Sequence, residues 1–414
     1  MSTLSDRSSH MHPKPAAGSD MWRWAFAGLA ASFVGIGLAR FAYTPLVPAL
    51  IAAKWFAASD VMYFGAINLA AYFVGAAVAR PLAVRFGAVT VLRLSMLSVV
   101  VACFACAVPL SFTWYLVWRI LPGIAGGLIM VLAASTILPH VAASRRGLVG
   151  GLVFIGVGLG AAASGTLVPL LLREGLAACW IGFAMLSALL TAASWRSWPD
   201  DAGEGANPTP VRQRLGTKAR RLNRSLIAEY GLIAFAMAPH TVFLVDYVAR
   251  ELGLGIDAGA GFWVLFGCGA VAGPLITGRI ADRIGFGRAL TLSYGLVAIA
   301  VVALPLGTHL TALLIISSVV IGGFTPGIVP LALGRVHELV PGDPALQRAI
   351  WGRAVTCFAG GQAVGAYGLS ALLAHGVVSY ATLFMLAAAA AVLALVLNLA
   401  TGLTVRGVPE KRLP

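Results

Sequence analysis

Twelve apolar runs, each long enough to cross a bilayer as a helix, dominate the sequence. A helix needs about 20 predominantly apolar residues to cross the hydrocarbon region, and it satisfies its own backbone hydrogen bonds there. The runs lie at residues 24–50, 60–79, 88–109, 113–138, 147–172, 176–195, 226–248, 258–278, 289–307, 310–333, 350–373 and 379–403. The pattern predicts an all-α membrane protein with twelve transmembrane helices.

The composition agrees with this prediction. Hydrophobic residues make up 59% of the chain and charged residues 11%, with a mean hydropathy of +0.90, whereas a soluble domain carries roughly 25% charged residues. The first run is too long for the apolar core of a signal peptide, so we expect it to remain in the protein. All five cysteines lie in apolar runs, and Cys103 and Cys106 are interpreted as small helix residues without a disulfide or a metal.

The basic residues are concentrated in alternate gaps between the runs. One set of gaps holds twenty-four Lys and Arg residues, and the other set holds only Lys54, Arg173 and Arg250. Cytoplasmic loops carry such an excess. We therefore expect a multi-pass protein of a bacterial-type inner (plasma) membrane with both termini in the cytoplasm. Loop anchoring accounts for the net charge of +14, so nucleic acid is not an expected partner.

A polar stretch divides the runs into two sets of six. The predicted organisation is an N-terminal tail (1–23), a six-helix bundle (24–196), a basic cytoplasmic linker (197–225), a second bundle (226–403) and a C-terminal tail (404–414). The basic end of the linker could form a short helix on anionic lipid.

A short loop sequence occurs in both halves of the chain. Residues 278–285 read Gly-Arg-Ile-Ala-Asp-Arg-Ile-Gly, and residues 80–87 read Arg-Pro-Leu-Ala-Val-Arg-Phe-Gly. Gly87 and Gly285 lie 198 residues apart (285 minus 87). Two pseudo-symmetric bundles around a midplane site form a transporter design in which the halves rock to give alternating access.

These motifs resemble those of the major facilitator superfamily. The second loop copy supplies Gly278, Asp282, Arg283 and Gly285, and the first copy keeps Arg85 and Gly87. Arg119-Ile-Leu-Pro-Gly123 resembles the superfamily's Arg-x-x-x-Gly motif, and residues 35–48, 239–247 and 360–365 resemble its YbfB/YjiJ-type branch. The resemblance covers the whole chain. It implies two six-helix bundles, secondary active transport that is often proton-driven, and a conformational role for the loop motif; it implies no substrate.

Two departures from the superfamily pattern are visible. Val84 stands where the first loop motif would carry an acid. Span five carries glycines with the spacing of the antiporter motif, but Ala161 and Ser164 replace two of its residues. The span-five glycines therefore leave antiport and simple close helix packing both open.

Two arginines lie inside apolar runs and are the first candidates for a substrate or coupling site. A charge at the depth of Arg40 costs at least ~2.5–3.5 kcal/mol, so it requires a cavity, a ligand or a partner helix; Tyr43 lies one turn on. Arg119 lies nearer the outer end of span four on the same face as Gly123. The resemblance links it to proton or substrate handling, and outward snorkelling is the alternative.

Three further residues complete the candidate site. His240 lies near the depth of Arg40 in the other half, and histidine changes charge near neutral pH; a shared cavity and a purely structural hydrogen bond are the alternatives. Asp246 is either an outer gate paired with one of the arginines or a solvated interface residue. Gln362, beside a glycine ridge, suits a substrate contact or an interhelical hydrogen bond. Glu229 is interpreted as interfacial.

The predicted function is transport of a small organic solute by alternating access, with protons as the coupling ion. The deep groups are arginines and a histidine with no acid at comparable depth, which favours an anionic substrate. The alternatives are an efflux antiporter for cationic or amphipathic compounds and, outside transport, a membrane sensor or receptor. No catalytic cluster is visible, so we expect no enzyme activity, no cofactor and no metal. The protein is expected to be monomeric.

Overall fold

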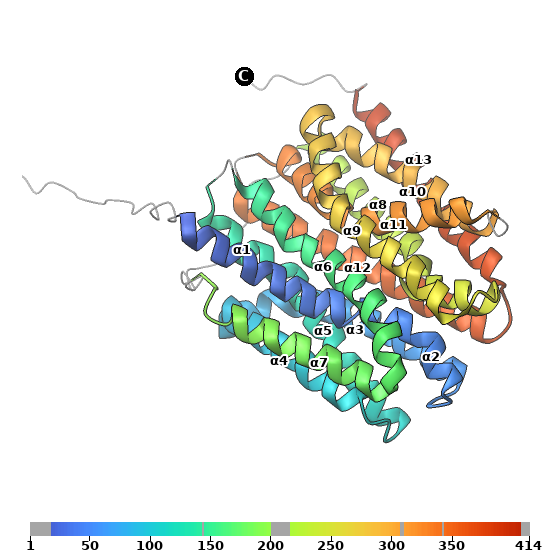
Figure 1. Cartoon of the computed structure of the whole chain (residues 1–414). Helices are drawn as coiled ribbons and strands as arrows, with labels where there is room; N and C mark the ends of the chain where they lie inside the picture. The colour runs from blue at the N-terminus through green and yellow to red at the C-terminus, as the bar shows by residue number, and fades with distance from the viewer. Residues whose placement is uncertain (1–17, 143–144, 200–215, 307–309, 342, 407–414) are drawn as a thin grey trace, which may run out of the picture.

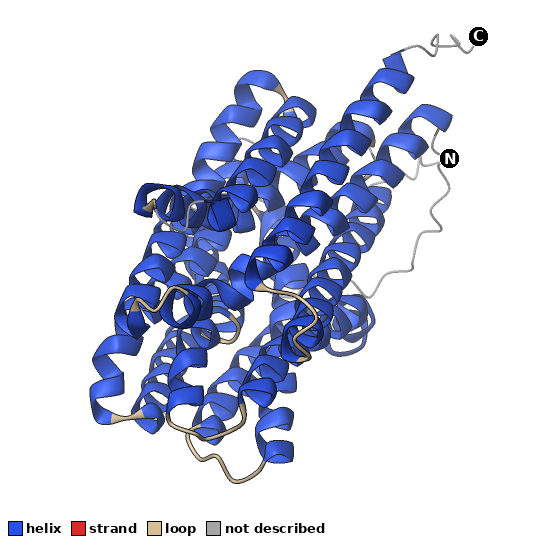
Figure 2. Ribbon diagram, turned by 90° about the vertical axis from the view of Figure 1, so that its right-hand side faces the viewer, coloured by secondary structure: helices blue, strands red, loops and turns tan. Residues whose placement is uncertain are grey.

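The computed structural model describes residues 18–142, 145–199, 216–306, 310–341 and 343–406, and this part of the chain is helical with no strand (Figures 1 and 2). Twelve of its helical segments are long and apolar enough to cross a membrane. Most of the predicted tails and of the linker, residues 1–17, 200–215 and 407–414, lie outside the described residues. The prediction of an all-α, twelve-span fold is confirmed.

The elements follow one another in an up-and-down order. The first half contains α1 (Gly18–Ser32), η1 (Phe33–Leu38), η2 (Phe41–Leu46), α2 (Val47–Ala52), α3 (Ala58–Phe86), α4 (Ala88–Cys106), α5 (Phe112–Ile137), η3 (Leu138–His140), α6 (Arg146–Leu171), η5 (Leu172–Glu174) and α7 (Leu176–Ser194). The second half contains α8 (Thr217–Asp246), η6 (Tyr247–Glu251), α9 (Gly255–Ile284), α10 (Phe286–Leu306), α11 (Thr311–Leu339), α12 (Pro344–Ala374) and α13 (Tyr380–Arg406).

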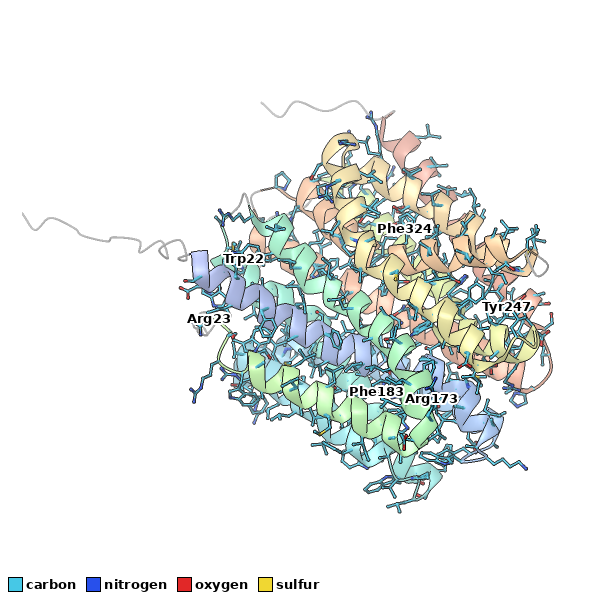
Figure 3. The ribbon with its side chains drawn as sticks, in the orientation of Figure 1. Trp22, Arg23, Arg173, Phe183, Tyr247 and Phe324 are labelled. Atoms are coloured by element: carbon cyan, nitrogen blue, oxygen red, sulfur yellow. The ribbon has the colours of Figure 1, made fainter. Side chains whose placement is uncertain are left out.

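We call the end of the molecule where α1 begins the terminal side and the opposite end the far side. Figure 3 shows the two ends, with Trp22 and Arg23 on the terminal side and Arg173 and Tyr247 on the far side. The labelled Phe183 lies on α7, and Phe324 lies on α11 of the second half.

The two copies of the loop motif end their helices in the same way. The N–H of Gly87 bonds to Ala83 O at 2.9 Å and that of Gly285 to Ala281 O at 2.8 Å, with φ of 83° and 84°. Side chains disfavour this backbone conformation, so glycine ends α3 and α9. The helices continue past the apolar runs up to these glycines, which is why both spans exceed their predicted bounds.

Glycines let the two halves approach closely through α6 and α9 (Figure 1). A Cβ on Gly158 would collide with the backbone of Ala270, and one on Gly267 with the backbone of Ala162. On α6, Gly156 and Gly160 also pack against the backbone of the first span. The span-five glycines therefore make close helix contacts, as small residues do in membrane proteins.

The basic end of the predicted linker is part of span seven. Helix α8 begins at Thr217, so Lys218, Arg221 and Arg224 form its first turns. A separate short surface helix was one expectation for these residues, and it is wrong. The run Ala-Arg-Arg-Leu-Asn-Arg contains neither Pro nor Gly, so the helix extends without interruption out of the apolar region.

Candidate functional site

The first span is interrupted beside Arg40. A π-helical turn, η1, ends at Leu38, and a 3-10 segment, η2, begins at Phe41 with Pro45 inside it. Arg40 lies between them with φ −111° and ψ −57°. Short π and 3-10 pieces within a helix often mark functional sites or hinges, and proline removes a backbone donor. The interruption brings Arg40 and Tyr43 to the interface between the halves.

Arg40 has aromatic neighbours and no acidic partner. Its guanidinium carbon lies 4.9 Å from the ring centroid of Phe41 and 5.5 Å from that of Tyr72. Its Nη2 atom is buried without a hydrogen-bond partner. Among the described residues, three ion pairs are present, and none involves Arg40. The cation is therefore held by ring faces alone, an arrangement that leaves donors free.

Arg119 is buried, with a relative exposure of 2%. Its Nη1 donates to Ala39 O at 3.3 Å, and its guanidinium carbon lies 4.2 Å from the ring centroid of Tyr43 and 5.8 Å from that of Trp180. Nε has no hydrogen-bond partner. Outward snorkelling, one alternative from the sequence, is wrong because the side chain points at the break in the first span.

Both arginines line one small cavity between the two halves. The cavity encloses about 20 Å³ and is lined by Arg40, Tyr43, Thr44, Gly65, Asn68, Leu69, Arg119, Thr241 and Val242. That volume accommodates about one water molecule. The lining residues come from the first, second and fourth spans of the first half and from α8 of the second half. Separation of the two halves at the cavity would therefore enlarge the cavity.

Two side chains of the cavity hold its walls in place. Tyr43 donates its hydroxyl to Val61 O at 2.7 Å, and Asn68 donates its amide to Arg119 O at 2.8 Å. Tyr72 was not among the residues singled out from the sequence. It lies one turn after Asn68 on α3, and this i, i+4 spacing of two polar residues inside an apolar run is the signal that could have identified it. Trp180 gave no comparable signal.

The far side of the cavity is closed by contacts across the halves. Thr44 Oγ1 donates to Thr241 O at 2.6 Å, and Trp263 Nε1 donates to Ser164 Oγ at 3.1 Å. The Trp263 ring stacks on Phe266, and Phe41 packs against both rings. The structure is therefore a state in which the far side is shut.

His240 does not share this cavity. Its Nε2 lies 2.8 Å from Ser317 Oγ on α11, and its ring packs edge-on against Phe384 of α13 at 5.3 Å. The side chain is fully buried inside the second bundle. In this structure α8 turns Thr241 and Val242, rather than His240, toward Arg40, so the shared cavity is not seen here and the role of His240 stays a prediction.

Asp246 is neither solvated nor paired with a cavity arginine. Its carboxylate has no exposed surface; Arg250 Nη1 lies 3.1 Å from Oδ1, and the Tyr380 hydroxyl donates to Oδ2. The solvated position is therefore wrong, and in this structure Asp246 pairs with Arg250 rather than with Arg40 or Arg119; its role as an outer gate stays a prediction. The triad fastens the far end of α8 to α13 within the second half.

Gln362 is fully buried on α12, and neither its Oε1 nor its Nε2 has a hydrogen-bond partner among the described residues. The adjacent Gly361 packs directly on the backbone of Gly231. A buried amide without partners costs free energy, so Gln362 remains a candidate contact in another state of the cycle.

Glu229 is buried, not interfacial, with a relative exposure of 2%. Ser225 donates to Oε1, and Asn398 of α13 donates to Oε2 at 2.9 Å. Glu229 and Asp246 are thus both buried within the protein, which their positions along span seven did not reveal. The sequence concealed Glu229 because it stands only five residues after an arginine and its partner Asn398 is 169 residues away.

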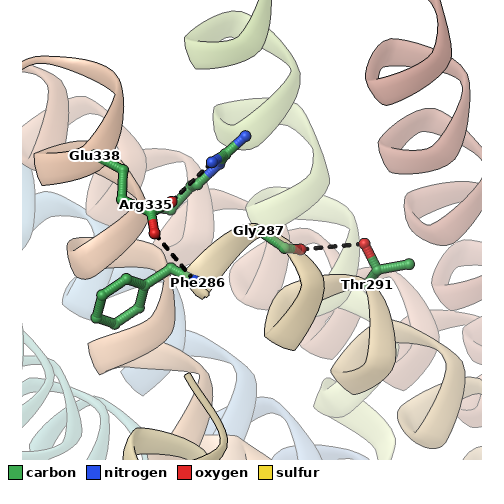
Figure 4. A network of polar contacts seen from close by, with 5 residues as sticks. All are labelled: Phe286, Gly287, Thr291, Arg335 and Glu338. Carbon is green, nitrogen blue, oxygen red and sulfur yellow. Dashed lines mark hydrogen bonds and ion pairs between the residues drawn. The ribbon is translucent and has the colours of Figure 1, made fainter. Parts of the chain in front are cut away.

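The loop-motif residues lie on the terminal side, away from the cavity. Asp282, Arg283 and Arg85 are exposed. After Gly285, the N–H of Phe286 donates to Glu338 Oε1 at 3.1 Å, and Arg335 pairs with Oε2 at 2.7 Å (Figure 4). A carboxylate at a helix N-terminus is favourable, so the end of α11 fixes the start of α10.

Comparisons with known proteins agree with this architecture. The sequence model described as "uncharacterised MFS-type transporter YbfB" matches residues 32–399. A gallate transporter of Pseudomonas putida is 26% identical over 298 residues, which are 64% of this chain and 66%, just under two thirds, of that protein.

Solved structures share the fold at low identity. A POT family transporter in complex with 5-aminolevulinic acid has a TM-score of 0.73 and 12% identity, with 94% of this chain and 96% of that chain covered. The nucleoside transporter NupG has a TM-score of 0.67 and 14% identity, with 91% and 99% covered. The chain belongs to the YbfB-type family of MFS transporters.

Proposed function

We propose that this transporter moves a small organic anion, with an aromatic carboxylate as the preferred class, by proton-coupled alternating access. The observation that carries the proposal is the pair Arg40 and Arg119, which line one cavity and have no acidic partner among the described residues. A buried charge without a partner is costly, and a bound carboxylate would supply the missing charge.

The free donors suit a carboxylate. Nη2 of Arg40 and Nε of Arg119 are buried and without hydrogen-bond partners. Guanidinium groups bind carboxylates through two parallel hydrogen bonds. An anion between the two side chains would therefore satisfy donors that the protein alone leaves unpaired.

The ring faces around the arginines support an aromatic substrate. Tyr43 lines the cavity, and Phe41, Tyr72 and Trp180 lie around the two guanidinium groups. Aromatic walls favour stacked or edge-on packing of a ring. Gallate, which the curated relative transports, is a hydroxylated aromatic carboxylate, and this chemistry matches the cationic and aromatic lining.

Transport of such a molecule requires the cavity to enlarge. About 20 Å³ is too small for a benzoate, so binding would accompany separation of the bundles 24–196 and 226–403. The interrupted backbone at Arg40 would absorb part of that movement.

We further propose that the terminal side faces the cytoplasm of a bacterial-type inner membrane and that the protein acts as a monomer. The excess of Lys and Arg on this side supports the orientation. A fluorescent-protein fusion at the C-terminus that folds only in the cytoplasm tests it, because fluorescence requires that end to stay inside.

Counterflow in proteoliposomes tests the substrate class. We expect labelled gallate to exchange, benzoate to compete and benzylamine, a cation of similar size, to have no effect. Arg40→Gln should abolish exchange while Arg173→Gln, at an exposed far-side position, retains it. Movement of organic cations without competition by any organic anion would overturn the proposal.

A further inference from the structure

Glu229 differs from Asp246, the other buried acid among the described residues, in lacking a cationic partner. Asp246 is paired with Arg250, whereas none of the ion pairs within the described residues includes Glu229. It lies in the middle part of α8, and its side chain is directed to α13 rather than to the cavity between the halves. A buried carboxyl without a cation is stabilised by binding a proton.

We propose that Glu229 is a proton-binding site of the transport cycle, linked by hydrogen bonds to the first turns of α10, which follow the loop motif. The inference rests on the proposed function, because it assigns the coupling proton to a residue outside the substrate cavity.

The contacts of Glu229 form a polar cluster between α8, α10 and α13. Ser225 donates to Oε1, Asn398 Nδ2 donates to Oε2 at 2.9 Å, and Thr291 of α10 donates to Asn398 Oδ1. Hydrogen bonds from these donors also stabilise the ionised form of the Glu229 carboxyl group. The cluster can therefore hold either protonation state, as a site that binds and releases a proton must.

A hydroxyl path leads from Glu229 toward the terminal side. Ser225 lies one turn nearer that side, and its hydroxyl is 2.8 Å from that of Thr401. Both residues are only partly buried, and Arg221 and Arg224 in the adjoining turns are exposed. A proton therefore has polar groups to follow between Glu229 and the terminal surface.

The same cluster reaches the first turn of α10, directly after the loop motif. The Thr291 hydroxyl lies 3.1 Å from Gly287 O, the second residue of α10, and shares its single proton between that carbonyl and Asn398 Oδ1 (Figure 4). Figure 4 also shows the neighbouring contacts of Phe286 and Arg335 with Glu338. A change of charge at Glu229 alters the strength of its hydrogen bond with Asn398. Because Asn398 also accepts from Thr291, the change reaches the first turn of α10.

Few other titratable groups face Glu229. Tyr294 faces it from α10, and Arg335 acts at longer range from α11. Helix α12 presents the Cys357 thiol against Gly231, and α13 presents Asn398 and Thr401, which do not titrate. On α8 itself the next residue, Tyr230, is titratable, and it lies near Tyr294. Elements α9, η2 and η6 meet α8 along its far half.

The site exists in one half only. The position 198 residues before Glu229 is Ala31, which is fully buried in α1, and Arg93 stands 198 residues before Thr291. A feature that the repeated architecture itself required would recur in both bundles. The buried acid and its polar contacts are therefore specific to the second bundle.

Infrared titration of the purified protein in lipid vesicles tests the site without a substrate. We expect a protonated-carboxyl band that titrates in the native protein, is absent in Glu229→Gln and persists in the control Glu251→Gln, an exposed far-side acid. Asn398→Leu, which keeps the acid, should move the midpoint of that band. A band unchanged in Glu229→Gln would overturn the proposal.

Transport of labelled gallate then separates proton coupling from binding. A gradient of one pH unit drives up to about tenfold accumulation per proton. Glu229→Gln should lose this accumulation yet keep counterflow within about twofold, since exchange needs no net proton movement. Accumulation of labelled gallate by the Glu229→Gln variant under the pH gradient would overturn the inference. Absence of gallate movement by the native protein would instead refute the proposed substrate, while the infrared result still decides the proton site.

Discussion

Ser317 holds His240: its Oγ lies 2.8 Å from the Nε2 atom of the imidazole. Ser317 also donates its only proton to Ala300 O at 2.6 Å, so His240 must donate from Nε2. Ser317 stands 198 residues after Arg119, and His240 stands close to the corresponding offset from Arg40 (40 plus 198 is 238). Corresponding positions of the two halves thus place arginines at the cavity in one bundle and a hydrogen-bonded His–Ser pair inside the other.

Ser317→Ala should therefore reduce stability rather than substrate affinity. It leaves the buried Nε2–H of His240 without an acceptor, which costs about 1–3 kcal/mol. We expect a lower Tm of the purified protein with KM for gallate unchanged, measured by thermal unfolding and by uptake. Ser98→Ala, whose hydroxyl bonds only within α4, is the matched control; a raised KM would place this pair in the substrate site.

Arg119→Lys should impair transport although it keeps the charge. A lysine cannot reach Ala39 O and cover the Tyr43 ring at the same time, because it lacks the planar fork. We expect kcat/KM to fall at least about tenfold. Arg173→Lys at the exposed far surface should behave like the native protein (Figure 3). Equal activity of the two variants would remove Arg119 from the site.

Gly285→Ala and Gly278→Ala should have opposite effects on stability, although both lie in the loop motif. Gly285 has φ +84°, which costs a side chain about 1–2 kcal/mol. A Cβ on Gly278 would meet nothing within 4 Å, and alanine is favoured over glycine inside a helix by about 0.5–1 kcal/mol. Thermal unfolding of both variants checks this; destabilisation by Gly278→Ala alone would contradict it.

Asp246→Asn should loosen the far end of α8. The change removes the charge that pairs with Arg250 and that accepts from Tyr380. Since Arg250 is half-exposed and can turn to water, we expect a loss of about 1–3 kcal/mol rather than that of a fully buried pair. Asp257→Asn, at an exposed site, is the control. Hydrogen exchange should rise in residues 246–254 only in the first variant.

Thr44→Val should shift the equilibrium toward states open on the far side. The substitution preserves the branched shape and removes the bond to Thr241 O, which is worth about 1 kcal/mol, a factor of about five in population. Labelling of a cysteine placed at Gly65, which lines the cavity, measures this from the far side. Thr325→Val, which loses only a bond within α11, should leave the labelling rate unchanged.

Some features of the protein were determined by the sequence alone. Chain segments of sufficient apolar length must become helices in a bilayer, so the twelve spans followed from hydropathy. The glycines at positions 87 and 285 revealed the repeat. Each ends a helix with a positive φ, and this local backbone requirement selects glycine in both copies. The depth of Arg40 was also readable, since depth is a position along one helix.

The tertiary structure decided which way each polar side chain faces. Hydropathy measures the cost of a residue at a given depth but not its direction around the helix axis or its neighbours. Arg119 points to a ring of the first span, His240 turns away from the cavity, and Glu229 finds Asn398 at a separation of 169 residues. Such partners come from distant helices, so only the packing of the two bundles could assign them.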